Sequence, residues 1–130
     1  MPWPPQKDEL LPRFDEPVGI ERKLAGYSLN LDPEKPRAWG KANGFSKMLG
    51  IDHRSIAYLT RVICDGIRCN AISEVRAAPT VGYNCLVQFR IAGTGRYSHR
   101  TAGIRTVWHL AAPDSCPRLV TAYLDKKEGQ

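Results

Sequence analysis

The spacing of hydrophobic residues changes from a helical to an extended period near residue 70. Before that point, apolar residues recur every three or four positions in two segments: Ala38, Ala42, Phe45 and Leu49, then Ile56, Leu59, Ile63 and Ile67. After it, they occupy every second position: Val81, Tyr83, Cys85, Val87, Phe89 and Ile91. These periods predict two amphipathic helices followed by a sheet with one buried face.

Flanking residues set the limits of the two predicted helices. The first helix is expected over about 36–49, where Gly50 is placed to end it. Asp52 is suited to cap the second helix, which is expected to end near 66–70.

Four strands are predicted in the second half of the chain. They cover about 72–77, 81–91, 104–110 and 119–124, and residues 93–95 (Gly-Thr-Gly) form a flexible connection. Short links favour antiparallel pairing, because parallel strands need long crossovers. The predicted fold class is therefore α+β, with two N-terminal helices packed on a four-stranded antiparallel sheet.

The first 22 residues have no usable hydrophobic period. They contain five prolines and mixed charges, so we interpret 1–22 as an extended leader or linker. Residues 23–130 are long enough for one domain, and the hydrophobic content of 42% is enough to bury a core.

Positive charge is concentrated in the predicted sheet. The chain carries 19 Lys and Arg against 13 Asp and Glu, a net charge of +6, and residues 81–121 contain five arginines against Asp114 alone. Such a surface favours a polyanionic partner, either nucleic acid or an acidic protein. A basic surface that serves only solubility is the alternative.

Several function classes lack their sequence signatures. There is no phosphate-binding loop, nucleophile elbow or zinc-protease motif, and no apolar run approaches the roughly 20 residues that cross a bilayer. The four cysteines lack ligand spacing, and Cys64 and Cys85 lie in apolar series that suit buried thiols. We expect no metal, no cofactor and no membrane association.

The remaining polar side chains are compatible with metal-independent RNA cleavage. In that reaction the 2′-hydroxyl of RNA is the nucleophile, and the protein moves protons and stabilises charge on the phosphorane. Imidazole, cationic and hydroxyl groups suit these tasks. The candidates are Lys41, His53, His99, Arg105, Thr106, His109, Thr121 and Tyr123.

Strand parity sorts these candidates by face. Arg105 and His109 share one face of their strand, whereas Thr106 shares the other with apolar residues, so its side chain is either core or functional. Thr121 and Tyr123 share a face of the last strand. An ordinary solvated face, or core packing for Tyr123, is the alternative in each case.

Four motifs in order carry a family resemblance. They are residues 24–30 (LAGYSLN), 40–42 (GKA), 105–108 (RTVW) and 117–123 (PRLVTAY). Together they resemble an uncharacterised C-terminal domain family of bacterial polymorphic toxins, which is similar to the barnase, EndoU, colicin and RelE (BECR) ribonuclease superfamily. The resemblance spans about residues 23–124.

The resemblance implies metal-independent endoribonuclease activity, with transfer RNA as substrate by analogy. It also implies an acidic immunity protein as partner, and action in the cytoplasm of a target cell after delivery as part of a larger secreted toxin. The matching polar residues are Lys41, Arg105, Thr106, Thr121 and Tyr123, and His109 stands where relatives are expected to have an apolar residue. The predicted RNA-binding residues are Arg90, Arg96, His99, Arg100 and Arg118.

Two other functions remain open from the sequence. The chain is alternatively a non-catalytic module that binds RNA or an acidic protein, with Tyr83, Phe89 and Tyr97 as stacking platforms. It is otherwise a phage or plasmid protein that inhibits a host enzyme by contact.

Overall fold

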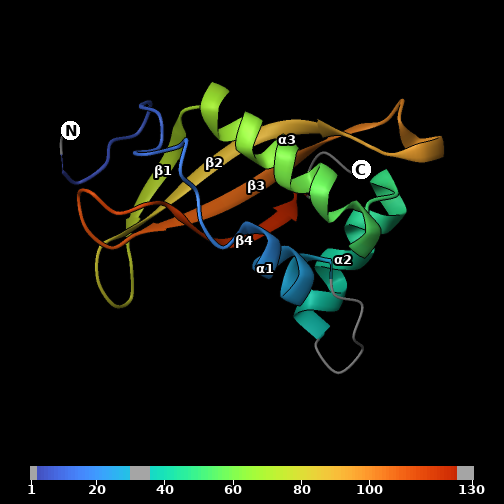
Figure 1. Cartoon of the computed structure of the whole chain (residues 1–130), viewed down its shortest axis with the longest axis horizontal. Helices are drawn as coiled ribbons and strands as arrows, with labels where there is room; N and C mark the ends of the chain where they lie inside the picture. The colour runs from blue at the N-terminus through green and yellow to red at the C-terminus, as the bar shows by residue number, and fades with distance from the viewer. Residues whose placement is uncertain (1–2, 30–35, 126–130) are drawn as a thin grey trace.

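A four-stranded antiparallel sheet forms the centre of the structure, a computed structural model that describes residues 3–29 and 36–125 (Figure 1). Its strands are β1 (Ile72–Ala77), β2 (Tyr83–Ala92), β3 (Thr101–Leu110) and β4 (Arg118–Leu124). Each strand pairs with the next along the chain, in the order β1-β2-β3-β4. The predicted α+β class and antiparallel sheet are confirmed.

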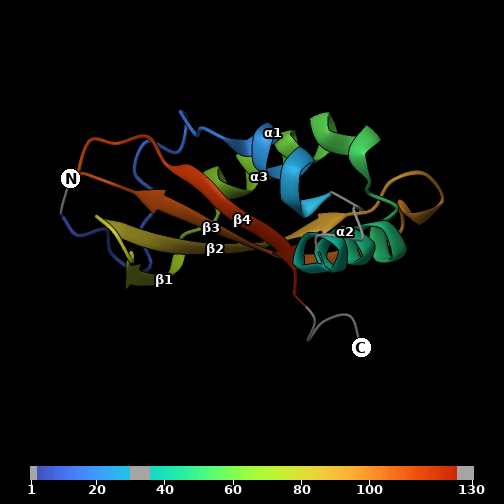
Figure 2. The same cartoon turned by 90° about the horizontal axis from the view of Figure 1, so that it is seen from below.

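Helices precede the sheet, as the sequence indicated. They are α1 (Ile20–Lys23), which continues into a π-helix (Leu24–Ser28), then α2 (Pro36–Leu49) and α3 (Ile56–Cys69). In Figure 2, α1 and α3 lie above the sheet and α2 lies toward its right-hand end. The predicted stripe of α3 is the buried one, since Leu59, Ile63 and Ile67 are fully buried.

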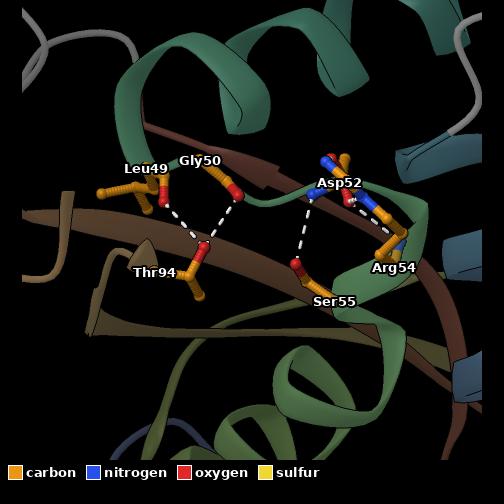
Figure 3. Close-up of polar contacts among 6 residues, drawn as sticks. All are labelled: Leu49, Gly50, Asp52, Arg54, Ser55 and Thr94. Atoms are coloured by element: carbon orange, nitrogen blue, oxygen red, sulfur yellow. Dashed lines mark hydrogen bonds and ion pairs between the residues drawn. The ribbon is translucent and has the colours of Figure 1, made fainter. Parts of the chain in front are cut away.

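A short polar junction turns the chain from α2 into α3 (Figure 3). Gly50 has φ +65°, and a Cβ there would approach the ring of Tyr97, so glycine suits this position. The Thr94 hydroxyl, from the β2–β3 hairpin, donates to the Gly50 carbonyl at 2.7 Å. Asp52 then accepts from the backbone N–H of Arg54 at 2.9 Å, which caps the His53–Ser55 turn leading into α3.

The β2–β3 hairpin is longer than its apolar pattern indicates. β3 begins at Thr101, three residues before the predicted start at Ile104, because its small residues Ala102 and Gly103 still pair with β2. A 3₁₀ turn, Gly95–Tyr97, closes the hairpin where a flexible connection was predicted.

The structure corrects the prediction of a leader or linker over residues 1–22. Within the described part of that segment, Leu11 is 1% exposed and belongs to the core. Backbone bonds join Asp8 and Glu9 to Ile72 at the start of β1. Val18 likewise bonds Leu119 in β4 at 3.1 Å. Isolated apolar residues between prolines carry no period, so the pattern could not reveal this packing.

The two faces of the sheet differ in what covers them. One face packs against α1 and α3 and holds the buried side chains of Cys85, Val87, Ile104, Trp108, Leu119 and Ala122. We call it the buried face, and the opposite side the open face. Among the described residues, no helix is long and apolar enough to cross a bilayer.

Candidate active site

Alternate residues of β3 point to opposite faces of the sheet. Ile104, Thr106 and Trp108 are fully buried, whereas Arg105, Val107 and His109 are only half-buried. This is the expected consequence of the two-residue period of a strand. The odd-numbered residues therefore lie on the open face.

The strand register places the candidate residues of β4 beside those of β3. Arg105 lies opposite Tyr123, and Val107 lies opposite Thr121. Because directly opposed residues of an antiparallel pair share a face, all four side chains lie on the open face. The predicted parity of Arg105, Thr121 and Tyr123 is thus realised in the structure.

Lys41 reaches this face from α2. Its Nζ atom donates to the Thr121 hydroxyl at 2.6 Å and lies 5.6 Å from the centre of the Tyr123 ring. A cation at this distance from an aromatic face is attracted by the ring quadrupole. The lysine is therefore held at the sheet by two residues of β4, beside the row that contains Arg105.

A pocket of about 430 Å³ opens on the same face. Its lining comes from β1, the β1–β2 connection, the first half of β2, the middle of β3 and the end of β4: Glu74, Arg76, Ala77, Pro79, Asn84, Leu86, Arg105, Val107 and Tyr123. Leu86 and Val107 are register partners at its centre. The pocket thus has an apolar floor with polar groups around it.

The charged side chains of the pocket differ in whether they have a hydrogen-bond partner. Arg76 donates to Glu74 Oε1 from Nε at 3.1 Å and from Nη2 at 2.9 Å. The Nε of Arg105, in contrast, is buried without a hydrogen-bond partner in the described part of the chain. Arg76 and Arg105 outnumber Glu74, and Lys41 stands beside the pocket. The site therefore favours an anion.

Thr106 does not belong to this site. Its side chain is fully buried on the opposite face, where the hydroxyl donates to the Val87 carbonyl at 2.8 Å and accepts from Trp108 Nε1 at 2.9 Å. Strand parity separates it from Arg105, its neighbour in sequence. The structure thus assigns Thr106 to the core and corrects its prediction as a catalytic residue.

The three histidines lie outside the pocket lining. His109 is on the open face, and its Nε2 lies 2.6 Å from the Val81 carbonyl, where it bonds the turn between β1 and β2. His53 is exposed in the turn before α3, and His99 is exposed in the loop before β3. The structure does not bring these side chains together.

The predicted RNA-binding arginines fall into two groups. Arg96 and Arg100 flank Tyr97 at the tip of the β2–β3 hairpin, with their guanidinium carbons 5.0 and 4.5 Å from its ring centre. Arg90 lies in β2, further from the tip of the same hairpin, and donates to the Thr101 hydroxyl at 3.0 Å. Arg118 begins β4, at the opposite end of the sheet.

Sequence reasoning missed the pocket residues of β1 and β2: Glu74, Arg76 and Asn84. The register of β1 with β2 was not visible, because a β-bulge between Ile72 and Glu74 shifts it.

Thiols and metal-binding groups do not contribute to the site. All four cysteines are free, and Cys85 is buried as predicted, while Cys64 is half-buried. Burial raises the pKa of the Cys85 thiol to about 11. Over residues 3–29 and 36–125, no three His, Cys, Asp or Glu side chains gather in a group that suits a metal ion.

Fold and site together define a small α+β domain with a cationic pocket on the open face of an antiparallel meander. The model of a protein family, described as a domain of unknown function (DUF6883), matches residues 10–126. The chain therefore belongs to the DUF6883 family. No curated protein and no solved structure shows significant similarity to it.

Proposed function

We propose that the open-face pocket cleaves RNA without a metal ion, by attack of the RNA's own 2′-hydroxyl. One observation carries the proposal: Arg105 and Tyr123 line one anion-favouring pocket, and Lys41, which bonds Thr121, lies beside Tyr123 at its edge. Phosphoryl transfer needs this kind of preorganised positive charge around the reacting phosphate.

The proposed roles follow from the chemistry of each side chain. Arg105 and Lys41 stabilise the negative charge of the phosphorane, and Thr121 positions Lys41 through their hydrogen bond of 2.6 Å. Glu74 is the carboxylate of the described pocket lining and accepts the proton of the 2′-hydroxyl. Tyr123 donates a proton to the departing 5′-oxygen.

Atoms and protons balance in this scheme. The 2′-oxygen forms a bond to phosphorus as Glu74 takes its proton, and the bond from phosphorus to the 5′-oxygen breaks as Tyr123 protonates that oxygen. The products are a 2′,3′-cyclic phosphate end and a 5′-hydroxyl end. RNA is required, because DNA lacks the attacking hydroxyl.

The biological setting is part of the same proposal and is supported by the toxin-family resemblance. The domain acts in the cytoplasm of a target cell, with transfer RNA as substrate, after delivery as part of a larger secreted toxin. An acidic immunity protein binds it, and the net charge of +6 supports attraction to such a partner.

The decisive experiment incubates the purified protein with total RNA in excess chelator. We expect discrete fragments with cyclic phosphate ends. Arg105→Ala and Lys41→Ala are each expected to slow cleavage by roughly 10²–10³-fold, since each removes a charge from the transition state.

Arg68→Ala is the matched control, because Arg68 is exposed on α3 and lies outside the pocket lining. It removes the same charge and should cleave at the wild-type rate, with all variants unfolding at similar temperatures. Intact RNA that the protein retains in a salt-sensitive manner would contradict the enzyme and indicate the non-catalytic binder.

A further inference from the structure

Two residues that line the pocket each have a buried polar side-chain atom with no hydrogen-bond partner among the described residues. One is a donor, Arg105 Nε, and the other is an acceptor, Asn84 Oδ1. Leaving such a buried group unsatisfied is unfavourable. Both residues line one open cavity, so a ligand bound there would lie beside the two unsatisfied groups.

The two residues stand at opposite ends of the pocket floor. Asn84 and Gln88 share a face of β2, and Gln88 is the register partner of Arg105. Asn84 is therefore four residues from the row of Arg105, a backbone separation of about 13 Å. A ligand that spans the floor would reach from one residue toward the other.

The floor between them is apolar. Leu86 and Val107 are register partners, and both line the pocket. Leu86 is 9% exposed and Val107 is half-buried, so the part of the floor that they form is apolar. A nucleobase can lie on such a surface while its polar edge points to one end.

We infer that Asn84 selects the base of the nucleotide whose phosphate Arg105 binds. The Asn84 amide offers an acceptor at Oδ1 and donors at Nδ2, the combination that complements base edges. This inference rests on the proposed function and deepens it: cleavage is base-selective, and its selectivity resides in β2 rather than in the cationic residues.

The first test maps cleavage positions on a mixed-sequence RNA by sequencing the fragment ends. The wild-type protein is expected to prefer one nucleotide, and Asn84→Ala is expected to reduce that preference by roughly 10-fold through slower cleavage at the preferred sites. Gln88→Ala is the matched control, since Gln88 is an amide on the same face of β2 that bonds Ser73 outside the pocket. It should leave the pattern unchanged.

Asn84→Asp keeps the shape of the side chain. It therefore tests the inference even if the alanine variant fails to fold. Its carboxylate only accepts, so the preference should shift toward bases that present two adjacent donors. An identical cleavage pattern for the wild type, Asn84→Ala and Asn84→Asp would overturn the inference.

Binding of single nucleotides separates this inference from the proposed function. Titration calorimetry with the four nucleoside 3′-monophosphates and with inorganic phosphate should show that the wild type distinguishes the bases and that Asn84→Ala distinguishes them less. Base-dependent binding without cleavage would refute the nuclease but support the role of Asn84. Equal affinity for all four nucleotides and for phosphate would refute the role of Asn84 whether or not RNA is cut.

Discussion

The buried and open faces of the sheet treat their polar side chains differently. On the buried face, the Thr106 hydroxyl bonds both Val87 and Trp108, and Ser28 donates to the Ala122 carbonyl at 2.9 Å. On the open face, Arg105 Nε and Asn84 Oδ1 are buried without a partner in the described part of the chain. The hydrogen bonds of Thr106 and Ser28 are completed inside the protein, whereas the two open-face atoms have no partner among the described residues.

Along β3, side chains on the buried face stabilise the fold, whereas side chains on the open face line the pocket. Thr106 and Arg105 are neighbours in sequence, yet one closes a core network and the other lines a pocket. Internal satisfaction is what a buried polar group needs to avoid destabilising the fold. Unsatisfied groups in a cavity are instead preorganised for binding.

The largest expected effect is on the buried face. Trp108→Ala should lower the free energy of unfolding by about 3–5 kcal/mol, because it empties a fully buried site. Urea unfolding followed by circular dichroism measures this loss. Val107→Ala, from the open face of the same strand, is the control and should cost much less. Equal losses in the two variants would remove the distinction between the faces.

A second prediction compares two threonines. Thr106→Val should cost about 1–3 kcal/mol of unfolding free energy, since it leaves Trp108 Nε1 unpaired in the core. Thr121→Val should leave the unfolding midpoint nearly unchanged and slow RNA cleavage, because it releases Lys41. Thermal unfolding and a cleavage assay on both proteins check the pair. If only Thr121→Val lost stability, the assignment of Thr106 to the core and of Thr121 to the site would be wrong.

A third prediction concerns the helix that covers the buried face. Asp52→Ala should lower stability by about 1 kcal/mol at neutral pH, through loss of the cap that leads into α3. The Arg54 side chain, and then its backbone N–H, lower the pKa of Asp52 in the folded state. The contribution of the carboxylate is therefore complete above its unfolded pKa of about 3.9, and it is lost as pH falls through the lower folded pKa.

Urea unfolding at several acidic pH values tests whether the contribution of Asp52 to stability decreases as pH falls. The difference in stability between the wild type and Asp52→Ala should shrink as pH falls below about 3.9. Cleavage at neutral pH should be similar for both proteins, because Asp52 lies outside the pocket lining. A difference that grows in acid would contradict the assigned cause.

The smallest effect is chemical and leaves the fold intact. Burial raises the pKa of the Cys85 thiol to about 11, so at pH 8 this thiol should resist alkylation in the folded protein. Cys69 is exposed and should react first. Mass spectrometry after brief iodoacetamide treatment, with and without denaturant, shows the order in which the cysteines are alkylated. Early modification of Cys85 would show that the buried face is accessible.

Local patterns were sufficient to predict the main elements of the fold. The periods of α3 and β2 identified their type and buried side, because Leu59, Ile63 and Cys85 lie where a 3.6- or 2-residue period places them. The strand parity of Arg105 and Tyr123 was predictable for the same reason. Thr106 was left open by the pattern, and the family resemblance alone favoured it as catalytic.

Features that depend on distant pairing could not be predicted. Glu74 is placed by the register of β1 with β2, which a β-bulge sets, and Asn84 is placed by the register of β2 with β3. The burial of Leu11 depends on a segment with no period, which crosses the domain and bonds to it through backbone atoms. Neither feature leaves a periodic signal in its own neighbourhood.

The segment before α1 has a consequence for self-association. Its backbone groups occupy hydrogen-bonding positions at Ile72 in one outer strand and at Leu119 in the other. Outer strands with free backbone groups can recruit a neighbouring chain and begin aggregation. By bonding one residue in each outer strand, this proline-rich stretch limits such edge-to-edge growth at those points, while the face with the pocket stays accessible.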